Sequence, residues 1–404
     1  MNPNKKILIA GASIAGPALA YWLQRYGFEV TVVERAPAPR YGGQNIDVKG
    51  AGRQVAVKMG LEEAIKAANT GEVGVQFVNE DNEVEASFPK DNPNGLTSEL
   101  EILRGDLVQI LYNATKEAVR YQFGTHIVGL SEQAEAVRVT LADGRTEAYD
   151  LVVAADGLRS ATRQLMFGDE PDIKFLGLYT CYLTIPRAGT DTDWARWYNA
   201  PDSRVLLLRP DNKGTTRASF NFLGDEDAYQ HLSPDEQRQV LREKLAGAGW
   251  EAPRLLAALD DDPDLYFDAV SQVRAPRWTH GRYALLGDAG YCPSPITGMG
   301  TTLALVGAYV LAGELARHPE DHQQAFTAYE QRLRPFVEAA QELPPGTPAL
   351  VYPSSRLGVA VLNKVAAVLA SKPVAAISAW FNRPEREPDN NLQLPDYEHD
   401  AAYS

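Results

Sequence analysis

Gly11, Ser13 and Gly16 follow a short apolar run, and Glu34 ends a second apolar run eighteen positions after Gly16. Gly11 permits a tight turn, a small residue at Ser13 lets a ligand approach the main chain, and Gly16 lets a helix pack closely on a strand. Free N–H groups at the start of that helix attract phosphate, and Glu34 can accept hydrogen bonds from a ribose hydroxyl pair. The pattern indicates a dinucleotide site, although Ser13 stands where the middle glycine is usual. A glycine-rich turn in another kind of α/β protein is the alternative.

Asp156 and Gly157 follow a second buried run, and Ser160 and Arg163 come next at helical spacing. The carboxyl ends of strands in an open α/β sheet line the ligand crevice, so we expect these side chains there. The alternative is a structural strand-to-helix turn in which Ser160 caps the helix.

A third apolar strand ends in Gly287-Asp288, and a Pro- and Gly-rich loop then leads into a long helix of small residues, predicted over 301–316. A strand end can place Asp288 on a ribityl hydroxyl. The helix start at 298–302 offers N–H groups to an electron-rich ring edge.

Basic residues stand near these stretches. Arg35 and Arg40 flank a loop rich in Pro and Gly, where Arg40 can meet phosphate or flavin or can be a solvated surface charge. Arg104 stands at the mouth of a helix for which Asp106 is a possible N-cap.

The remaining pattern predicts the elements that position these residues. Two short helices are expected over 50–69, a hairpin over 74–88, strands over 128–141 and 147–150, and helices over 233–246 and 325–343. Residues 174–222 alternate apolar and polar residues and predict a mainly antiparallel sheet. Its aromatic residues, of which any one can be plain core or part of a wall for a planar ligand, are Tyr179, Tyr182, Trp194, Trp197 and Tyr198.

We therefore expect an α/β protein with a Rossmann-like domain, an inserted mainly antiparallel substrate sheet and a C-terminal helical region. The predicted domain segments are 1–73, 101–173 and 273–343 for the Rossmann-like domain, 74–100 and 174–272 for the substrate sheet, and 344–404 for the C-terminal helix and a tail that is predicted flexible after Pro384.

Composition excludes several classes of protein. The chain has 404 residues and a net charge of −14 without a basic stripe, which argues against nucleic acid as a partner. Only Cys181 and Cys292 are present, which suits a reducing cytosol, and the start leaves no room for a signal peptide, so a cytoplasmic location is expected. No apolar run reaches the length of a membrane span, and the nearest, 357–380, reads as a packed helix.

No metal site is expected. His318 and His322 are four positions apart, but Pro319 disturbs the helix that would put them on one face. The acid run 260–264 lacks the glycine and spacing of a calcium loop. No nucleophile elbow is present either, and no catalytic side chain can be named.

The three stretches together resemble the flavin-dependent aromatic hydroxylases, which are single-component FAD monooxygenases with a para-hydroxybenzoate-hydroxylase-like fold. The first matches the ADP-binding fingerprint of that family, the second a motif associated with FAD and NAD(P)H, and the third the motif that holds the ribityl chain and flavin ring. The resemblance covers residues 5–340 and is nearest to the tetracycline-inactivating branch, through 43–50 and Arg104. The residues assigned to FAD are Gly11, Ser13, Ile14, Ala15, Gly16, Glu34, Arg35, Arg40, Arg104, Asp156, Asp288, Pro295, Gly298, Met299, Gly300 and Thr301.

The sequence departs from that family at three places. Gly290-Tyr291 replaces a common Ala-His, Thr302 replaces a common Asn, and Gly307 replaces a common acid. Tyr291 can approach the flavin ring or can be a packing residue.

The resemblance implies that NAD(P)H reduces FAD and that O2 forms a flavin C4a-hydroperoxide, which hydroxylates a planar aromatic or polycyclic small molecule. A cofactor that supplies the oxidising power fits a chain with no convincing metal or nucleophile. The alternatives are a flavin-binding sensor or carrier without turnover, and a flavin reductase or halogenase of the same fold. The sequence does not determine the oligomeric state.

Overall fold

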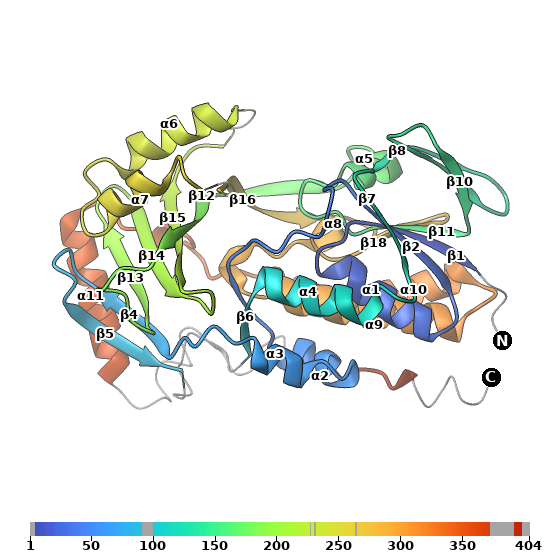
Figure 1. The fold of residues 1–404 in the computed structure, drawn as a ribbon, viewed down its shortest axis with the longest axis horizontal. Helices are drawn as coiled ribbons and strands as arrows, with labels where there is room; N and C mark the ends of the chain where they lie inside the picture. The colour runs from blue at the N-terminus through green and yellow to red at the C-terminus, as the bar shows by residue number, and fades with distance from the viewer. Residues whose placement is uncertain are drawn as a thin grey trace.

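A computed structural model describes residues 5–90, 100–226, 228–229, 232–262, 265–371 and 392–397. It has two parts, seen side by side in Figure 1, one around a mainly parallel sheet and one around a mainly antiparallel sheet, and β12 and β16 extend between them. The predicted α/β class with an inserted antiparallel sheet is confirmed.

The first part is built on a six-stranded sheet in the order β17-β18-β11-β1-β2-β7. All neighbouring strands are parallel except β17 and β18. Its apolar runs are almost completely buried because helices cover the sheet, as a parallel sheet requires. The strands are β1 (Lys6–Ala10), β2 (Glu29–Glu34), β7 (Arg120–Phe123), β11 (Leu151–Ala154), β17 (Thr279–His280) and β18 (Tyr283–Leu285).

Helix α9 (Gly300–Arg317) is the central helix of this part and is buried from Thr301 to Leu315. It packs against α1 (Ala15–Arg25), α2 (Gly50–Lys58) and α10 (His322–Gln341), which is why its small residues are needed on every side. The other helices of this part are α3 (Glu62–Ala67), α4 (Arg104–Thr115), α5 (Ala161–Phe167), α8 (Asp288–Tyr291) and the 3-10 turn η1 (Pro295–Thr297).

Two small sheets complete the first part. β8 (Ile127–Glu132), β9 (Val137–Leu141) and β10 (Thr146–Tyr149) form an antiparallel sheet, and β3 (Asn45–Asp47) pairs with β6 (Glu101–Leu103). β6 leads directly into α4, so this pair fixes the position of Arg104.

The second part is a seven-stranded sheet in the order β16-β12-β15-β14-β13-β4-β5. It is antiparallel apart from the parallel pair β13 and β4, and β4 and β5 form the predicted hairpin. Its strands are β4 (Gly74–Val78), β5 (Val84–Pro89), β12 (Asp172–Pro186), β13 (Ala195–Ala200), β14 (Arg204–Pro210), β15 (Thr215–Leu223) and β16 (Tyr266–Arg274).

One face of this sheet is covered by α6 (Pro234–Leu245) and α7 (Ala252–Ala258) and forms an apolar core with them. Alternation along the strands places Tyr179 and Tyr198 in that core, whereas Tyr182 and Trp197 are half-buried on the opposite face. α6 lies within the helix predicted over 233–246, and it begins with a Ser233 cap in a full capping box with Glu236.

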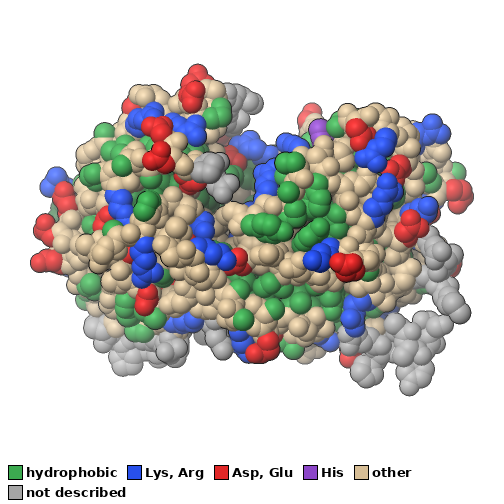
Figure 2. All heavy atoms as spheres, viewed as in Figure 1, with side chains coloured by type: hydrophobic (Ala, Val, Ile, Leu, Met, Phe, Trp, Pro, Cys, Tyr) green, Lys and Arg blue, Asp and Glu red, His purple; other side chains and the backbone are tan. Residues whose placement is uncertain are grey.

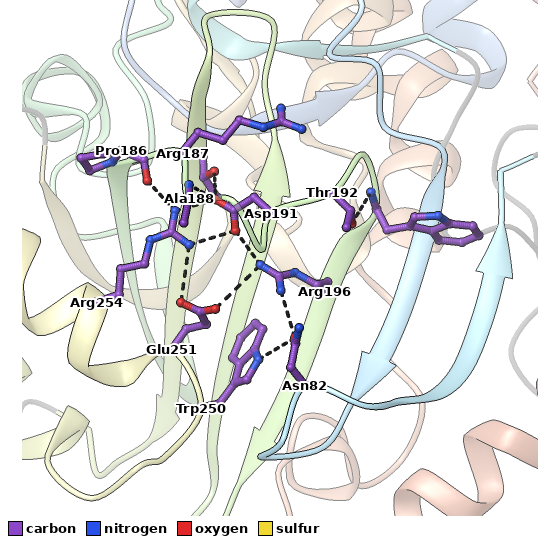
Figure 3. A network of polar contacts seen from close by, with 12 residues as sticks. Asn82, Pro186, Arg187, Ala188, Asp191, Thr192, Arg196, Trp250, Glu251 and Arg254 are labelled. Atoms are coloured by element: carbon purple, nitrogen blue, oxygen red, sulfur yellow. Dashed lines mark hydrogen bonds and ion pairs between the residues drawn. The ribbon is translucent and has the colours of Figure 1, made fainter.

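A network of hydrogen bonds and ion pairs connects elements on the face of the sheet that α6 and α7 cover (Figure 3). Asp191 accepts hydrogen bonds from Arg196 of β13 at 2.6 Å and from Arg254 of α7 at 2.9 Å, and Arg196 also donates to Asn82 of the β4–β5 hairpin at 2.9 Å. Trp250 donates to the same Asn82 oxygen at 2.9 Å. The network therefore joins α7, the hairpin and β13.

Residues 356–371 form α11 (Arg356–Ser371), which packs on β5. The remainder of the apolar run predicted to be a helix lies outside the described residues. The prediction of a flexible tail is wrong for 392–397, because Tyr397 is buried against α9 and donates to Glu314 at 2.6 Å.

The predicted N-cap at Asp106 is also wrong. α4 begins two residues earlier, at Arg104, and has no side-chain cap. Asp106 instead accepts a hydrogen bond from Asn212 at 3.0 Å and pairs with Lys213 at 2.8 Å, so its carboxylate binds the turn that follows β14.

Of the residues described, no helix has the length and hydropathy of a membrane span.

Candidate functional site

The Gly11–Gly16 loop connects β1 to α1 and is tightly constrained. Gly11 has a φ of +107°, and a Cβ there would lie 2.4 Å from the carbonyl oxygen of Ala155. A Cβ on Gly16 would lie 1.9 Å from the carbonyl oxygen of Gly11. Both positions therefore require glycine, which lets the backbone turn and brings α1 close to the strand.

The three sequence stretches meet at one edge of the six-stranded sheet. Gly11 touches Ala155 and Asp156 of the second stretch, and a Cβ on Gly287 of the third would lie 3.1 Å from Ala15 of the first. Arg163 donates to the carbonyl oxygen of Ala289 at 2.9 Å and so ties the second stretch to the third. The edge is the one where β1, β11 and β18 end, as expected for a ligand crevice.

Glu34 ends β2 beside the glycine loop. Its carboxylate accepts hydrogen bonds from the backbone N–H of Ala12 at 3.0 Å and of Ala36 at 2.9 Å. Arg40 lies 3.8 Å from the same carboxylate with an exposed side chain, and Arg35 is exposed. Glu34 is thus fixed next to the loop, whereas Arg40 is held only by a weak surface pair.

Arg104 reaches the glycine loop from the start of α4. Its guanidinium donates to the Ser13 hydroxyl at 2.8 Å and to the carbonyl oxygen of Gly42 at 3.3 Å. Burial lowers the pKa of Arg104, and the nearby Asp288 opposes that shift. Two residues 91 positions apart therefore present a hydroxyl and a cation together at the helix start.

Asp156 makes most of its hydrogen bonds within its own turn. It accepts from the hydroxyls of Ser160 and Thr162, and Ser160 in turn accepts from the Arg163 N–H at 2.8 Å. The structural reading of Ser160 as the cap of α5 is confirmed. Asp156 still borders the crevice, because a Cβ on Gly11 would touch its Cα at 2.9 Å.

Asp288 lies at the start of α8 with an exposed side chain. Although the side chain is exposed, desolvation by the surrounding protein raises its pKa above the ordinary aspartate value, opposed by a hydrogen bond with Cys292 and by the charge of Arg104. A Cβ on Gly300 would lie 3.8 Å from its carboxylate, so Asp288 faces the beginning of α9.

The loop between α8 and α9 presents further polar groups. Pro295 and Gly298 are exposed, Met299 and Thr301 are buried, and α9 begins at Gly300 without a side-chain cap. Ser294 is buried at a φ of +79°, and its hydroxyl has no hydrogen-bond partner among the described residues. Uncapped N–H groups and an unpaired buried hydroxyl are the groups that a polar ligand satisfies.

Tyr291, for which ring contact and packing were both open, is a packing residue. It is buried, packs at a tilt against Trp278 with ring centroids 4.6 Å apart, and shares a 2.9 Å hydroxyl contact with Tyr329. Thr302 is likewise buried and donates to the carbonyl oxygen of Lys49 at 3.2 Å. These departures from the family pattern are therefore accommodated by the packing of α9.

The face of the seven-stranded sheet that α6 and α7 leave uncovered supplies a second set of groups. Trp197 packs toward Tyr352 and Ile296, and Ile296 belongs to the η1 turn that precedes α9. Tyr266 is 46% exposed and lies nearly parallel to Tyr182, with ring centroids 5.8 Å apart. Figure 2 shows that the surface is hollowed between α6 on one side and α5 with β8 on the other.

Sequence reasoning missed Tyr266, Arg209 and Tyr352 on this side of the sheet. Tyr266 and Arg209 alternate with core residues along β16 and β14, which is the signal that could have revealed them. Tyr352 follows α10 in an irregular segment, where no periodicity exists to place it.

No group of three or more His, Cys, Asp or Glu side chains within the described ranges could hold a metal ion. His318 follows the end of α9 and pairs with Glu314 at 3.8 Å, whereas His322 begins α10. The two histidines therefore do not share a helix face, as the position of Pro319 predicted.

A parallel sheet with a glycine loop, an acid at the end of β2 and a second loop before an uncapped helix are typical of a dinucleotide-binding flavoprotein. The chain belongs to the FAD binding domain family, whose model matches residues 4–343.

Two relatives that match nearly the whole chain are named as flavin- or FAD-dependent monooxygenases. A flavin-dependent monooxygenase of Legionella longbeachae is 37% identical and the match covers 98% of this chain and 100% of that protein. The FAD-dependent monooxygenase asL4 of Sarocladium schorii is 36% identical, with 98% of each chain covered. The crystal structure of tetracycline destructase Tet(51) superposes with a TM-score of 0.82 at 34% identity over 98% of this chain and 100% of that one. The predicted resemblance to the tetracycline-inactivating branch is confirmed.

Proposed function

We propose that this FAD-dependent monooxygenase uses NAD(P)H and O2 to hydroxylate a planar aromatic or polycyclic small molecule. The observation that carries the proposal is the meeting of the three stretches at one sheet edge, across from the uncovered polar and aromatic face of the second sheet. This arrangement offers one site for a cofactor and an adjoining surface for a planar substrate.

The residues present fit FAD. Ser13, Arg104 and the start of α1 offer a hydroxyl, a cation and free N–H groups to phosphates, and Glu34 is placed for ribose hydroxyls. Asp288 and the uncapped start of α9 suit the ribityl chain and the ring. The full set proposed for FAD is Gly11, Ser13, Ile14, Ala15, Gly16, Glu34, Arg35, Arg40, Arg104, Asp156, Asp288, Pro295, Gly298, Met299, Gly300 and Thr301.

Bound FAD supplies the oxidising chemistry, through the flavin C4a-hydroperoxide that the family resemblance implies. The chain's own residues bind and orient it, and they exclude water so that reduced oxygen is not lost as H2O2. Trp197, Tyr352 and Ile296 are the apolar groups that we propose for that exclusion.

The substrate class follows from the uncovered sheet face. The nearly parallel rings of Tyr182 and Tyr266 offer a stacking surface for a flat molecule. The name of Tet(51), a tetracycline destructase, supports a polycyclic substrate. We further propose that segments 1–73, 101–173 and 273–343 form the cofactor domain, that 74–100 and 174–272 form the substrate domain, and that 344–404 is a C-terminal region.

NADPH and NADH oxidation by the holoenzyme, measured with and without planar phenols and polycyclic ketones, tests the proposal. We expect oxidation that one of these compounds stimulates. A protein that binds FAD but oxidises neither nucleotide with any compound would instead be a flavin carrier.

A further inference from the structure

Arg209 lies at the end of β14 on the uncovered face of the seven-stranded sheet and is bound by two carboxylates. Its Nε donates to Glu72 Oε2 at 2.7 Å, and its Nη2 donates to Glu72 Oε1 at 3.0 Å and to Glu101 Oε1 at 2.5 Å. Glu101 belongs to β6, three residues before Arg104. The cluster therefore joins the substrate sheet to the part that carries the candidate FAD site.

Both carboxylates are sealed from solvent. Their side chains are completely buried, and Glu101 accepts further hydrogen bonds from Thr70 and from Asn45, each at 2.7 Å. The Arg209 side chain, in contrast, is 20% exposed. The guanidinium is thus the group of this cluster that solvent or a ligand can reach.

One end of the guanidinium is unused. Nε and Nη2 donate to the two glutamates, but no acceptor among the described residues bonds Nη1. Nη1 is also not among the buried unpaired atoms, so it retains contact with solvent. Arg209 and Tyr182 lie on the same sheet face, because β14 and β12 both pair with β15, and Arg209 also interacts electrostatically with Tyr182 and with Asp47 of β3.

The net charge of the cluster formed by Arg209, Glu72 and Glu101 depends on pH. Burial raises the pKa of Glu101 to about 7, Glu72 adds to that rise, and Arg209 opposes it. With a pKa of about 7, Glu101 passes from mostly protonated at pH 6 to mostly ionised at pH 8, so the cluster becomes more negative over that range. A guanidinium balanced in this way can donate a hydrogen bond, yet it offers no net positive charge to attract an anion.

We propose that Arg209 is a specificity-determining residue that donates from Nη1 to a neutral carbonyl oxygen of the substrate, while Glu72 and Glu101 disfavour a substrate carboxylate at that position. This inference rests on the proposed function and names the polar group that the substrate brings to the uncovered sheet face. A ketone or quinone carbonyl accepts such a hydrogen bond, and a carboxylate would be repelled by the two glutamates.

The test uses the holoenzyme without reduced nicotinamide and two probes, 9,10-anthraquinone and anthraquinone-2-carboxylate, with binding followed by the change in flavin absorbance. At pH 8 we expect wild-type protein to bind the neutral quinone at least about tenfold more tightly than its carboxylate, the scale of one charge-assisted hydrogen bond. Arg209→Lys keeps the charge but loses the planar guanidinium that holds Nη1 away from the two glutamates, and it should weaken quinone binding about tenfold.

Glu101→Gln provides the sharper test because glutamine resembles the protonated glutamate. At pH 8 this variant should bind the carboxylate about tenfold more tightly than wild-type protein does, and at pH 6 the two proteins should agree within about twofold. Glu314→Gln is the matched control, since Glu314 is equally buried and paired with Arg332 at 2.6 Å but lies on α9.

Equal binding of both probes by wild-type protein, or identical binding by Glu101→Gln and wild-type protein at pH 8, would overturn the proposal. Failure of the quinone to bind at all would overturn it too. The binding pattern together with an absence of any nicotinamide oxidation would contradict the proposed function and leave this inference intact.

Discussion

The phenol oxygen of Tyr291 lies 2.1 Å from the position that a Cβ on Gly307 would occupy. The same hydroxyl contacts Tyr329 at 2.9 Å, and Tyr329 donates to the carbonyl oxygen of Leu285 at 2.9 Å. Two departures from the family pattern, a tyrosine in place of histidine and a glycine in place of an acid, therefore depend on each other. The glycine leaves the space that the tyrosine hydroxyl occupies. Packing against Tyr291 therefore accounts for the glycine at position 307.

Gly307→Ala should destabilise the protein. Alanine favours a helix by about 1 kcal/mol over glycine, but the overpacking against Tyr291 costs more, so we expect a net loss of about 1–2 kcal/mol in the free energy of unfolding. Urea unfolding of the holoenzyme measures it. Adding Tyr291→Phe should recover part of the loss, because the clashing oxygen is removed.

Gly189→Ala is the control for that experiment. A Cβ on Gly189 meets no atom within 4 Å, so the substitution should change the free energy of unfolding by less than about 0.5 kcal/mol. Equal effects at positions 189 and 307 would contradict the packing account.

Glu34→Ala should weaken FAD binding about tenfold to a hundredfold. Removing charge-assisted hydrogen bonds to the ribose costs about 1.5–3 kcal/mol. Titration of the apoprotein with FAD, followed by flavin fluorescence, measures the change, and circular dichroism checks that the fold is kept. An unchanged FAD affinity would show that Glu34 serves only the backbone N–H groups of Ala12 and Ala36.

Asp191 predicts a pH-dependent contribution to stability. Burial alone would raise its pKa, but hydrogen bonds from Arg254, Ala188 and Thr216 outweigh burial and lower the pKa from 3.8 to about 2. The folded state therefore gains stability above pH 3.8 and loses it as the pH falls through about 2. Asp191→Asn should cost about 2 kcal/mol at pH 7 and about 1 kcal/mol at pH 3, measured by urea unfolding.

Asp235→Asn is the control, because the Asp235 side chain is fully exposed and only pairs with Arg238 at 3.6 Å. A cost for Asp191→Asn that stays constant from pH 7 to pH 3 would contradict the lowered pKa.

Local patterns predicted much of the fold. The buried runs of β1, β11 and β18 depend on residues a few positions apart and were predicted correctly. The Ser160 cap of α5, which was given as the alternative for that stretch, has the same local origin. Asp106 was predicted wrongly because a cap pattern competes with a distant partner, Asn212, which no local window contains.

Long-range contacts explain what the sequence could not supply. The contact of Arg104 with Ser13 and the cluster of Arg209 with Glu72 and Glu101 join segments roughly one hundred residues apart. Tyr397 fits a space beside Gly313, where a Cβ would lie 2.2 Å from its ring, and this shape match has no signature in composition. Periodicity can say which side of a strand a residue occupies, but it cannot say what covers that side.

Turnover in 18O2 tests the central claim most directly. A substrate found by stimulated NAD(P)H oxidation is converted under labelled oxygen in unlabelled water, and the product is analysed by mass spectrometry. The account predicts one labelled oxygen atom in the product, because a monooxygenase transfers one atom of O2 to its substrate. Label found only in hydrogen peroxide, or a product oxygen drawn from water, would contradict it.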